Sequence, residues 1–199
     1  MKRSRKGVPI ARRPAVYTVD EEETDGGGGL SALLSDDLRL LNARAAGVLR
    51  DIEDNVSEYG IVVRPTPKGP GKFATNAIEE EGVCLGIYTG RLHLAEARVP
   101  DNGRHLDLKP VNGTSLFVEG SGPSRINAAD FNHSCCRANV AFRYLAFEGT
   151  ALQAVIATNL RRIEPGEELL LDYGDAYFRP GGSRPCMCEP VCPKGRFFV

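Results

Sequence analysis

A chain of 199 residues is long enough for one domain with its own core, and its net charge of −1 gives no global attraction to nucleic acid. No apolar run approaches the roughly 20 residues that span a bilayer, and no basic start followed by an apolar stretch indicates a secretory signal. These features predict a soluble intracellular protein without a membrane role, in which the six cysteines are more often metal ligands than disulfides.

Residues 1–29 predict a disordered tail rather than a folded segment. Six lysines and arginines lie within the first 13 residues without one acid, residues 20–25 are acidic, and four glycines follow. Such a composition buries too little apolar surface to offset the entropy of ordering. The basic block fits a nuclear-localisation patch or a weak nucleic-acid contact, and it fits a plain solvated tail equally well.

Residues 31–58 predict one amphipathic helix in a flanking segment, 30–59. Ser35 is the expected N-cap, followed by two aspartates in the first turn. Apolar residues recur at steps of three and four and predict one face: Leu34, Leu38, Leu41, Ala45, Val48, Ile52 and Val56. We expect this face to pack on the following domain. A self-pairing coiled coil is the alternative, although Gly47 would weaken its seam.

From Gly60 the pattern changes to short runs of strand type that are separated by Gly and Pro. The predicted strands are 60–64, 72–74, 83–88, 106–108, 116–119, 139–144, 151–159 and 168–172. No long helical periods alternate with them, which argues against a doubly wound parallel sheet. The sequence therefore predicts a mostly β, β-rich α+β domain.

Five motifs follow one another in this part of the chain. They are KGPGKFA (68–74), GVCLGIYTG (82–90), FNHSC (131–135), EPGEELLLDYG (164–174) and CMCEPVCPKGRF (186–197). In this order they resemble the SET-domain family of protein lysine methyltransferases, over residues 61–196. A single glycine loop or a lone Asp-Tyr would be weak evidence, whereas five motifs in order are strong evidence.

The resemblance implies a fold of small curved sheets, with a SET domain at 60–178 and a post-SET zinc segment at 179–199. It also implies a pseudoknot-like crossing, in which the segment through Tyr173 passes beneath the loop that holds Asn132. Such threading is rare among protein folds.

Tyr173, at the end of the strand 168–172, is the expected central catalytic residue. Tyr88 is expected to form a wall of the lysine channel and to hydrogen-bond the amine, although core packing is the alternative role. A lysine amine has a pKa near 10.4 in water, so a methyltransferase must remove its proton and desolvate it. A narrow aromatic channel that ends beside a cationic sulfonium lowers that pKa, and tyrosine hydroxyls orient the amine.

The expected cofactor is S-adenosylmethionine. The resemblance assigns its binding to Lys68, Gly69, Gly71, Asn132, His133 and Met187. Asn132 would pair with the amino-acid end of the cofactor, and His133 would contribute mainly backbone atoms. The glycines would let the backbone approach the ligand closely.

The cysteines point to one tetrahedral zinc. Cys186, Cys188 and Cys192 supply three closely spaced thiolates, and such a zinc needs four ligands. The family takes the fourth from its Asn-His-Ser-Cys signature, here Cys135, with Cys136 as the competing ligand. Cys84 is expected to be a core residue.

Three departures from the family pattern bear on activity. Asp130 stands where an arginine is common, the loop after Cys135 lacks a proline so that Asn139 comes one place late, and Leu171 replaces an aromatic residue. Leu171 predicts di- or trimethylation, unless Phe142 refills the space. Asp130 and the irregular loop favour the alternative of a catalytically inactive SET module that binds peptide or cofactor.

The resulting expectation is a lysine methyltransferase that acts on a histone tail or another protein. Its expected location is the nucleus, with the cytoplasm as the alternative.

Overall fold

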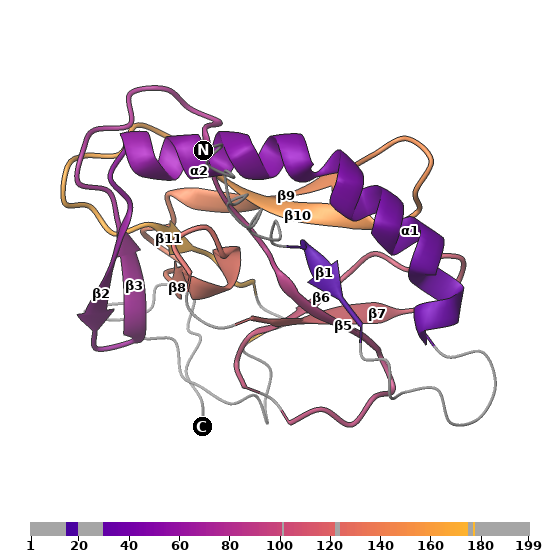
Figure 1. The fold of residues 1–199 in the computed structure, drawn as a ribbon. Coiled ribbons are helices and arrows are strands. Elements are labelled where there is room, and N and C mark those ends of the chain that lie inside the picture. Colours follow the sequence, from indigo (N-terminus) through magenta and orange to yellow (C-terminus); the bar gives the residue numbers. More distant parts are fainter. Residues whose placement is uncertain (1–14, 20–29, 101, 122–123, 175–176, 178–199) are drawn as a thin grey trace, which may run out of the picture.

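The computed structural model describes residues 15–19, 30–100, 102–121, 124–174 and 177. Within these residues the fold is β-rich, with three small sheets and two α-helices that lie along one side of them (Figure 1). This arrangement confirms the predicted β-rich α+β class. No helix in the described part of the chain is long and apolar enough to span a membrane.

The predicted single helix is two helices, α1 (Leu30–Arg44) and α2 (Ala46–Glu58). The prediction was wrong at Ala45, where a ψ of −8° opens the helix and bends its axis, and Ser35 lies inside α1 rather than at its cap. The apolar face continues through Ala45, but it contains Leu49, which is buried, in place of the predicted Val48, which is only half-buried. The rest of the predicted face is buried in the core of this chain: Leu34, Leu38, Leu41, Ala45, Ile52 and Val56. The helices therefore dock on the domain, as expected, with α1 against β1 and α2 against β4.

The largest sheet has the strand order β4-β10-β9-β11-β8. Its strands are β4 (Cys84–Ile87), β8 (Asn132–His133), β9 (Val140–Ala146), β10 (Gln153–Asn159) and β11 (Leu170–Leu171). β9 and β10 form an antiparallel hairpin, while β11 runs parallel to both of its neighbours.

Two further sheets complete the β structure. The four-stranded sheet, of order β1-β5-β7-β6, contains β1 (Tyr17–Thr18), β5 (Gly90–Leu94), β6 (His105–Asp107) and β7 (Leu116–Gly120). The two-stranded sheet pairs β2 (Val62–Thr66) with β3 (Gly69–Phe73), and a short 3-10 helix, η1 (Ala128–Asp130), precedes β8. The sequence patterns did not predict β1, β5 or β8.

The prediction that residues 1–29 form a tail was wrong for residues 15–19. β1 pairs in parallel with β5, and the side chains of Val16 and Tyr17 are fully buried. The Asn42 side chain of α1 accepts a hydrogen bond from the Val16 backbone N–H at 2.8 Å, and the Tyr17 hydroxyl donates to the Gln153 carbonyl. The short apolar run was hidden because the basic and acidic flanks dominate the composition. Residues 1–14 and 20–29 lie outside the described part.

The crossing at β11 confirms the predicted threading. β8 and β9 follow one another in sequence, yet β11 lies between them, with Leu170 opposite Asn132 and Leu171 opposite His133. The connecting loop closes over the inserted strand, because the Ser134 and Asn139 backbone N–H groups donate to the Leu171 and Leu170 carbonyls. β11 therefore delivers Tyr173 to the side of the Asn132–His133 strand.

The Asn139 side chain holds this crossing from inside. It is fully buried, and its Oδ1 accepts the Leu170 backbone N–H at 2.7 Å. Its Nδ2 donates to the Glu168 carbonyl at 2.8 Å and to the Glu167 carboxylate at 2.9 Å. Although the loop lacks the proline and Asn139 comes one place late, the Asn139 side chain therefore still fixes the threaded strand.

Candidate active site

Two cavities meet where β11, β8 and the loop before β6 converge. The polar cavity encloses about 780 Å³, including its part open to solvent, and is lined by Lys68, Arg104, Asp130, Asn132 and His133 among others. The aromatic cavity encloses about 490 Å³, also including its part open to solvent, and is lined by Tyr88, His105, Phe142 and Leu171 among others. The two cavities share five lining residues, Gly103, Ala129, Phe131, Tyr173 and Tyr177.

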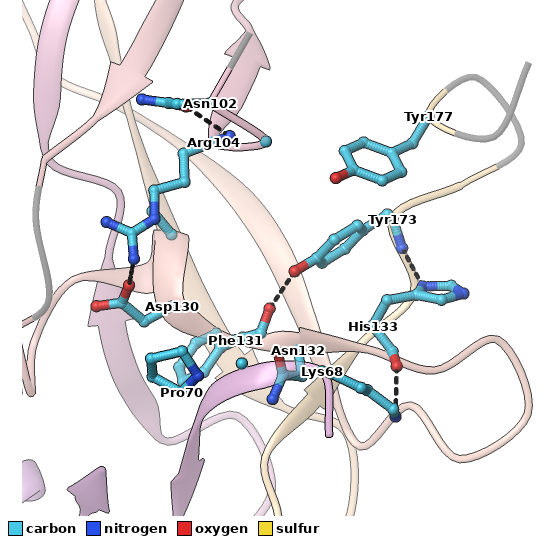
Figure 2. Close-up of a pocket in the computed structure, with 13 residues that line it drawn as sticks. Lys68, Pro70, Asn102, Arg104, Asp130, Phe131, Asn132, His133, Tyr173 and Tyr177 are labelled. Carbon is cyan, nitrogen blue, oxygen red and sulfur yellow. Dashed lines mark hydrogen bonds and ion pairs between the residues drawn. The ribbon is translucent and has the colours of Figure 1, made fainter. Parts of the chain in front are cut away.

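Tyr173 lies in the wall between the cavities. Its backbone N–H donates to His133 Nδ1 at 3.1 Å, and its hydroxyl donates to the Phe131 carbonyl (Figure 2). Its ring meets the edge of Tyr177 at a centroid distance of 4.8 Å. Since both ends of the residue are held, the hydroxyl oxygen has a fixed position at the junction of the cavities.

Tyr88 lines the aromatic cavity from the end of β4. Its hydroxyl donates to the Arg104 carbonyl, and its ring contacts Phe142 edge-on at 5.8 Å. Burial is the main cause of the raised pKa of this phenol, so it stays protonated at neutral pH. Tyr88 thus lines a cavity, and its predicted roles as a wall of the lysine channel and as a hydrogen-bond partner of the amine stay predictions.

The predicted glycine loop forms the turn between β2 and β3. Lys68 and Gly69 line the polar cavity, and the Lys68 ammonium donates to the His133 carbonyl at 2.9 Å. Gly69 has a φ of +106°, and no atom lies within 4 Å of where a Cβ would stand, so the backbone borders open space.

Gly71 has a different place from the one expected. It does not line either cavity, and a Cβ there would lie 2.7 Å from Asn132 Nδ2 and closer still to Glu168 Oε1. Gly71 therefore leaves room for the hydrogen bond between these two side chains. Gly71 thus affects the polar cavity indirectly, because it allows the hydrogen bond that orients Asn132.

Asn132 and His133 are both buried and are both oriented by hydrogen bonds. Asn132 Nδ2 donates to Glu168 Oε1 at 2.8 Å and to Thr66 Oγ1 at 3.2 Å, which assigns the carbonyl oxygen as the remaining polar atom of the amide. His133 Nδ1 accepts the Tyr173 N–H, so the neutral ring carries its proton on Nε2. The ring of His133 thus positions Tyr173, in agreement with a largely structural side chain.

Two charged residues of the polar cavity have an arrangement that no motif predicted. Arg104 Nη2 lies 2.9 Å from Asp130 Oδ1, and the Asp130 side chain is only 1% exposed, against 25% for Arg104. The sequence singled out Asp130 but not its partner, because Arg104 belongs to no motif and is 26 residues away. Tyr177 was also missed, although its place four residues after Tyr173 was a usable signal.

Lys72 is a buried cation behind the same wall. Its side chain is fully buried in β3, and its Nζ donates to the Arg125 and Asn127 carbonyls at 2.8 and 2.6 Å. It also lies 4.8 Å from the centre of the Phe131 ring. Burial lowers the pKa of this lysine to about 7, against the opposing effect of the Asp130 charge.

The predicted zinc ligands fall only partly within the described residues. Cys135 is half-buried and Cys136 is exposed, while Cys186, Met187, Cys188 and Cys192 lie outside the described part. Among the residues that are described, no three His, Cys, Asp or Glu side chains are grouped for a metal. Cys84, predicted to be a core residue, is half-buried and packs against the core, and burial raises the pKa of its thiol to about 11.

Comparison with models of known protein families identifies one match. The family model of the SET domain matches residues 15–174, which include β1, both helices and every described site residue except Tyr177. No curated protein matches the chain significantly.

Proposed function

The chain belongs to the SET domain family, whose members are generally S-adenosylmethionine-dependent protein lysine methyltransferases, and from this we propose that it methylates the side-chain amine of a protein lysine. The observation that carries this proposal is the meeting of two cavities at the Tyr173 hydroxyl and the Phe131 carbonyl. A polar cavity for a charged cofactor and an aromatic cavity for an alkyl amine would bring the two reactants together there.

The chemistry of the polar cavity fits S-adenosylmethionine. Lys68 offers positive charge to its carboxylate, and the Asn132 carbonyl oxygen can accept from its ammonium. Gly69 leaves the backbone open to the ligand. Met187, in the segment 179–199, is the proposed contact of the adenine. Bound there, the cofactor supplies an electrophilic methyl group on a cationic sulfur.

The aromatic cavity supplies what a lysine needs before it can react. Its apolar walls bury the alkyl stem and disfavour the ammonium form, so the proton leaves to solvent before the amine reaches the junction. Tyr88 and Tyr173 each donate their hydroxyl proton to a backbone carbonyl. Both hydroxyl oxygens therefore remain as acceptors for the amine N–H groups, and these hydrogen bonds would aim the nitrogen lone pair toward the methyl group.

We propose further that Cys135, Cys186, Cys188 and Cys192 bind one zinc ion. Four thiolates are a donor set that structural zinc prefers. The half-buried thiol of Cys135 lies two residues after His133, so a zinc on it would hold the tail beside the two cavities. Cys136 remains the competing ligand.

The substrate and the location are proposed from composition and family alone. A histone tail is the favoured substrate and the nucleus the favoured compartment, with the cytoplasm as the alternative. The basic block at the N-terminus fits weak contact with nucleic acid.

The decisive experiment is transfer of labelled methyl groups. The protein is incubated with radiolabelled S-adenosylmethionine and core histones, nucleosomes or cell extract, and the labelled residue is located by mass spectrometry. Tyr173→Phe should lose most of the transfer, whereas Tyr144→Phe, at an exposed tyrosine of β9, should retain it. Cofactor binding without transfer to any substrate would instead support the inactive binding module. Label on a residue other than lysine would contradict the proposed activity.

A further inference from the structure

Arg104 lines the polar cavity, and its backbone carbonyl holds a tyrosine that lines the aromatic cavity. Its carbonyl accepts the hydroxyl of Tyr88 and the backbone N–H of Gly120, the latter at 2.8 Å. Its guanidinium pairs with Asp130 at 2.9 Å and donates to the Ser121 carbonyl at 3.2 Å. One residue therefore supplies the acceptor of one active-site tyrosine and, at its other end, an ion pair.

Asp130 leads from that ion pair to the second tyrosine. Its Oδ2 accepts the Ser124 backbone N–H at 3.0 Å, so the carboxylate is held from two sides. The next residue, Phe131, carries the carbonyl that accepts the Tyr173 hydroxyl. Figure 2 shows this sequence of contacts from the guanidinium on one side of the polar cavity to Tyr173 on the other.

A carboxylate as buried as that of Asp130 is costly unless it is paired. The segment that carries Arg104 and the η1 turn that carries Asp130 come from separate parts of the chain, and the ion pair joins them at the polar cavity, next to the shared residues Gly103 and Phe131. The pair therefore links the segment that carries the acceptor of Tyr88 to the turn that precedes the acceptor of Tyr173.

We propose that the Arg104–Asp130 ion pair is a positioning pair for methyl transfer, which fixes the two carbonyls that hold the Tyr88 and Tyr173 hydroxyls. This role rests on the proposed lysine methylation. The pair sets the alignment of the amine and does not contribute to the affinity for either reactant. Neutralising one partner leaves the other charge unpaired and displaces the wall, whereas neutralising both removes the cause of the displacement.

The first test is a double-mutant cycle with Arg104→Gln, Asp130→Asn and the double variant. We expect kcat to fall at least 10-fold in each single variant, while KM for S-adenosylmethionine and for the protein substrate changes less than threefold. The double variant should be no slower than the slower single variant, and Arg104→Lys should stay within threefold of the parent. Arg162→Gln, which breaks the exposed pair with Glu79, is the matched control and should leave kcat unchanged.

Three results would overturn the role. They are single variants with kcat within threefold of the parent, a double variant whose loss is the product of the single losses, and a cofactor KM that rises while kcat stays constant. The last result would make Arg104 a ligand of the cofactor carboxylate instead. If Asp130→Asn does not fold, Arg104→Gln and Arg104→Lys decide the point by the same kcat criterion, since the Arg104 side chain is partly exposed.

A second measurement does not need turnover. In protein labelled with 3-fluorotyrosine, the ¹⁹F resonances of Tyr88 and Tyr173 should move in Arg104→Gln, whereas those of Tyr17 and Tyr144 should not. Unmoved resonances at Tyr88 and Tyr173 would contradict the positioning role even if the parent transfers methyl groups. A parent that transfers no methyl group would defeat the proposed function alone, and the spectra would still test the pair.

Discussion

Lys72 should make the stability of this protein depend on pH in a way that Lys72→Met removes. The folded protein lowers the pKa of this lysine from its ordinary 10.5 to about 7, with burial as the main cause. Between these values the unfolded chain binds more protons than the folded protein, so the free energy of unfolding rises with pH. The destabilisation is complete below pH 7 and disappears as the pH rises toward 10.5.

The size of the effect follows from the shift. At 1.36 kcal/mol per pKa unit the whole shift is worth about 5 kcal/mol, of which about 2 kcal/mol is recovered between pH 7 and pH 9. The difference in the free energy of unfolding between the parent and Lys72→Met at pH 7 alone is a poorer test, because two opposing effects contribute to it. Methionine removes a buried charge, but it leaves the Arg125 and Asn127 carbonyls without their donor.

The assay is urea unfolding of the parent and Lys72→Met at pH 7, 8 and 9, followed by circular dichroism. The parent should gain about 2 kcal/mol relative to the variant over this range. Lys109→Met, at an exposed lysine, is the control and should give curves parallel to the parent. Curves of the parent and Lys72→Met that stay parallel would show that Lys72 is not a desolvated cation, and the reasoning from its burial would fail.

Three further predictions concern the proposed chemistry. Tyr173→Phe should cut methyl transfer roughly 10- to 1000-fold and leave cofactor affinity within threefold. The loss follows because one oriented hydrogen bond in the transition state is worth on the order of 1.4–4 kcal/mol. Unchanged turnover would move the chemistry to Tyr88. Leu171 lines the aromatic cavity without a hydroxyl, so the parent should form di- or trimethyl-lysine, whereas Leu171→Tyr should stop at one methyl group. Mass spectrometry of the product under excess cofactor measures this. A parent that stops at one methyl group, with no change in the variant, would show that this position does not set the product. Metal analysis should find about one zinc per chain, lost together with activity in Cys135→Ser, and less than about 0.2 zinc in an active parent would exclude the site.

The parts of the site that were predictable from the sequence are those in which neighbouring residues carry the signal. Asn132 and His133 stand side by side in β8, and Tyr173 follows directly on the strand that threads beside them. Lys68 and Gly69 form a turn whose composition is itself the signal. The resemblance also predicted the crossing of β11, which hydrophobic periodicity alone would not have suggested.

The missed features depend on contacts between distant segments. β1 has only two residues, and its burial comes from β5 and α1, far away in sequence. Arg104 acquires its role from Asp130, and Ala45 breaks a helix whose periodicity continues through it. In each case local sequence preferences are compatible with several structures, and tertiary packing selects one of them.

The two sequence features that favoured an inactive module have specific partners in the fold. Asn139 compensates for the missing proline, because three side-chain hydrogen bonds, each worth about 1 kcal/mol net, hold β11 in the loop regardless of the loop's own stiffness. Asp130 is paired with Arg104, so its buried negative charge is balanced within the wall of the polar cavity. Since Lys68 supplies a cation to this cavity, neither departure removes a group that the proposed reaction requires. The described geometry therefore supports the enzyme over the binding module.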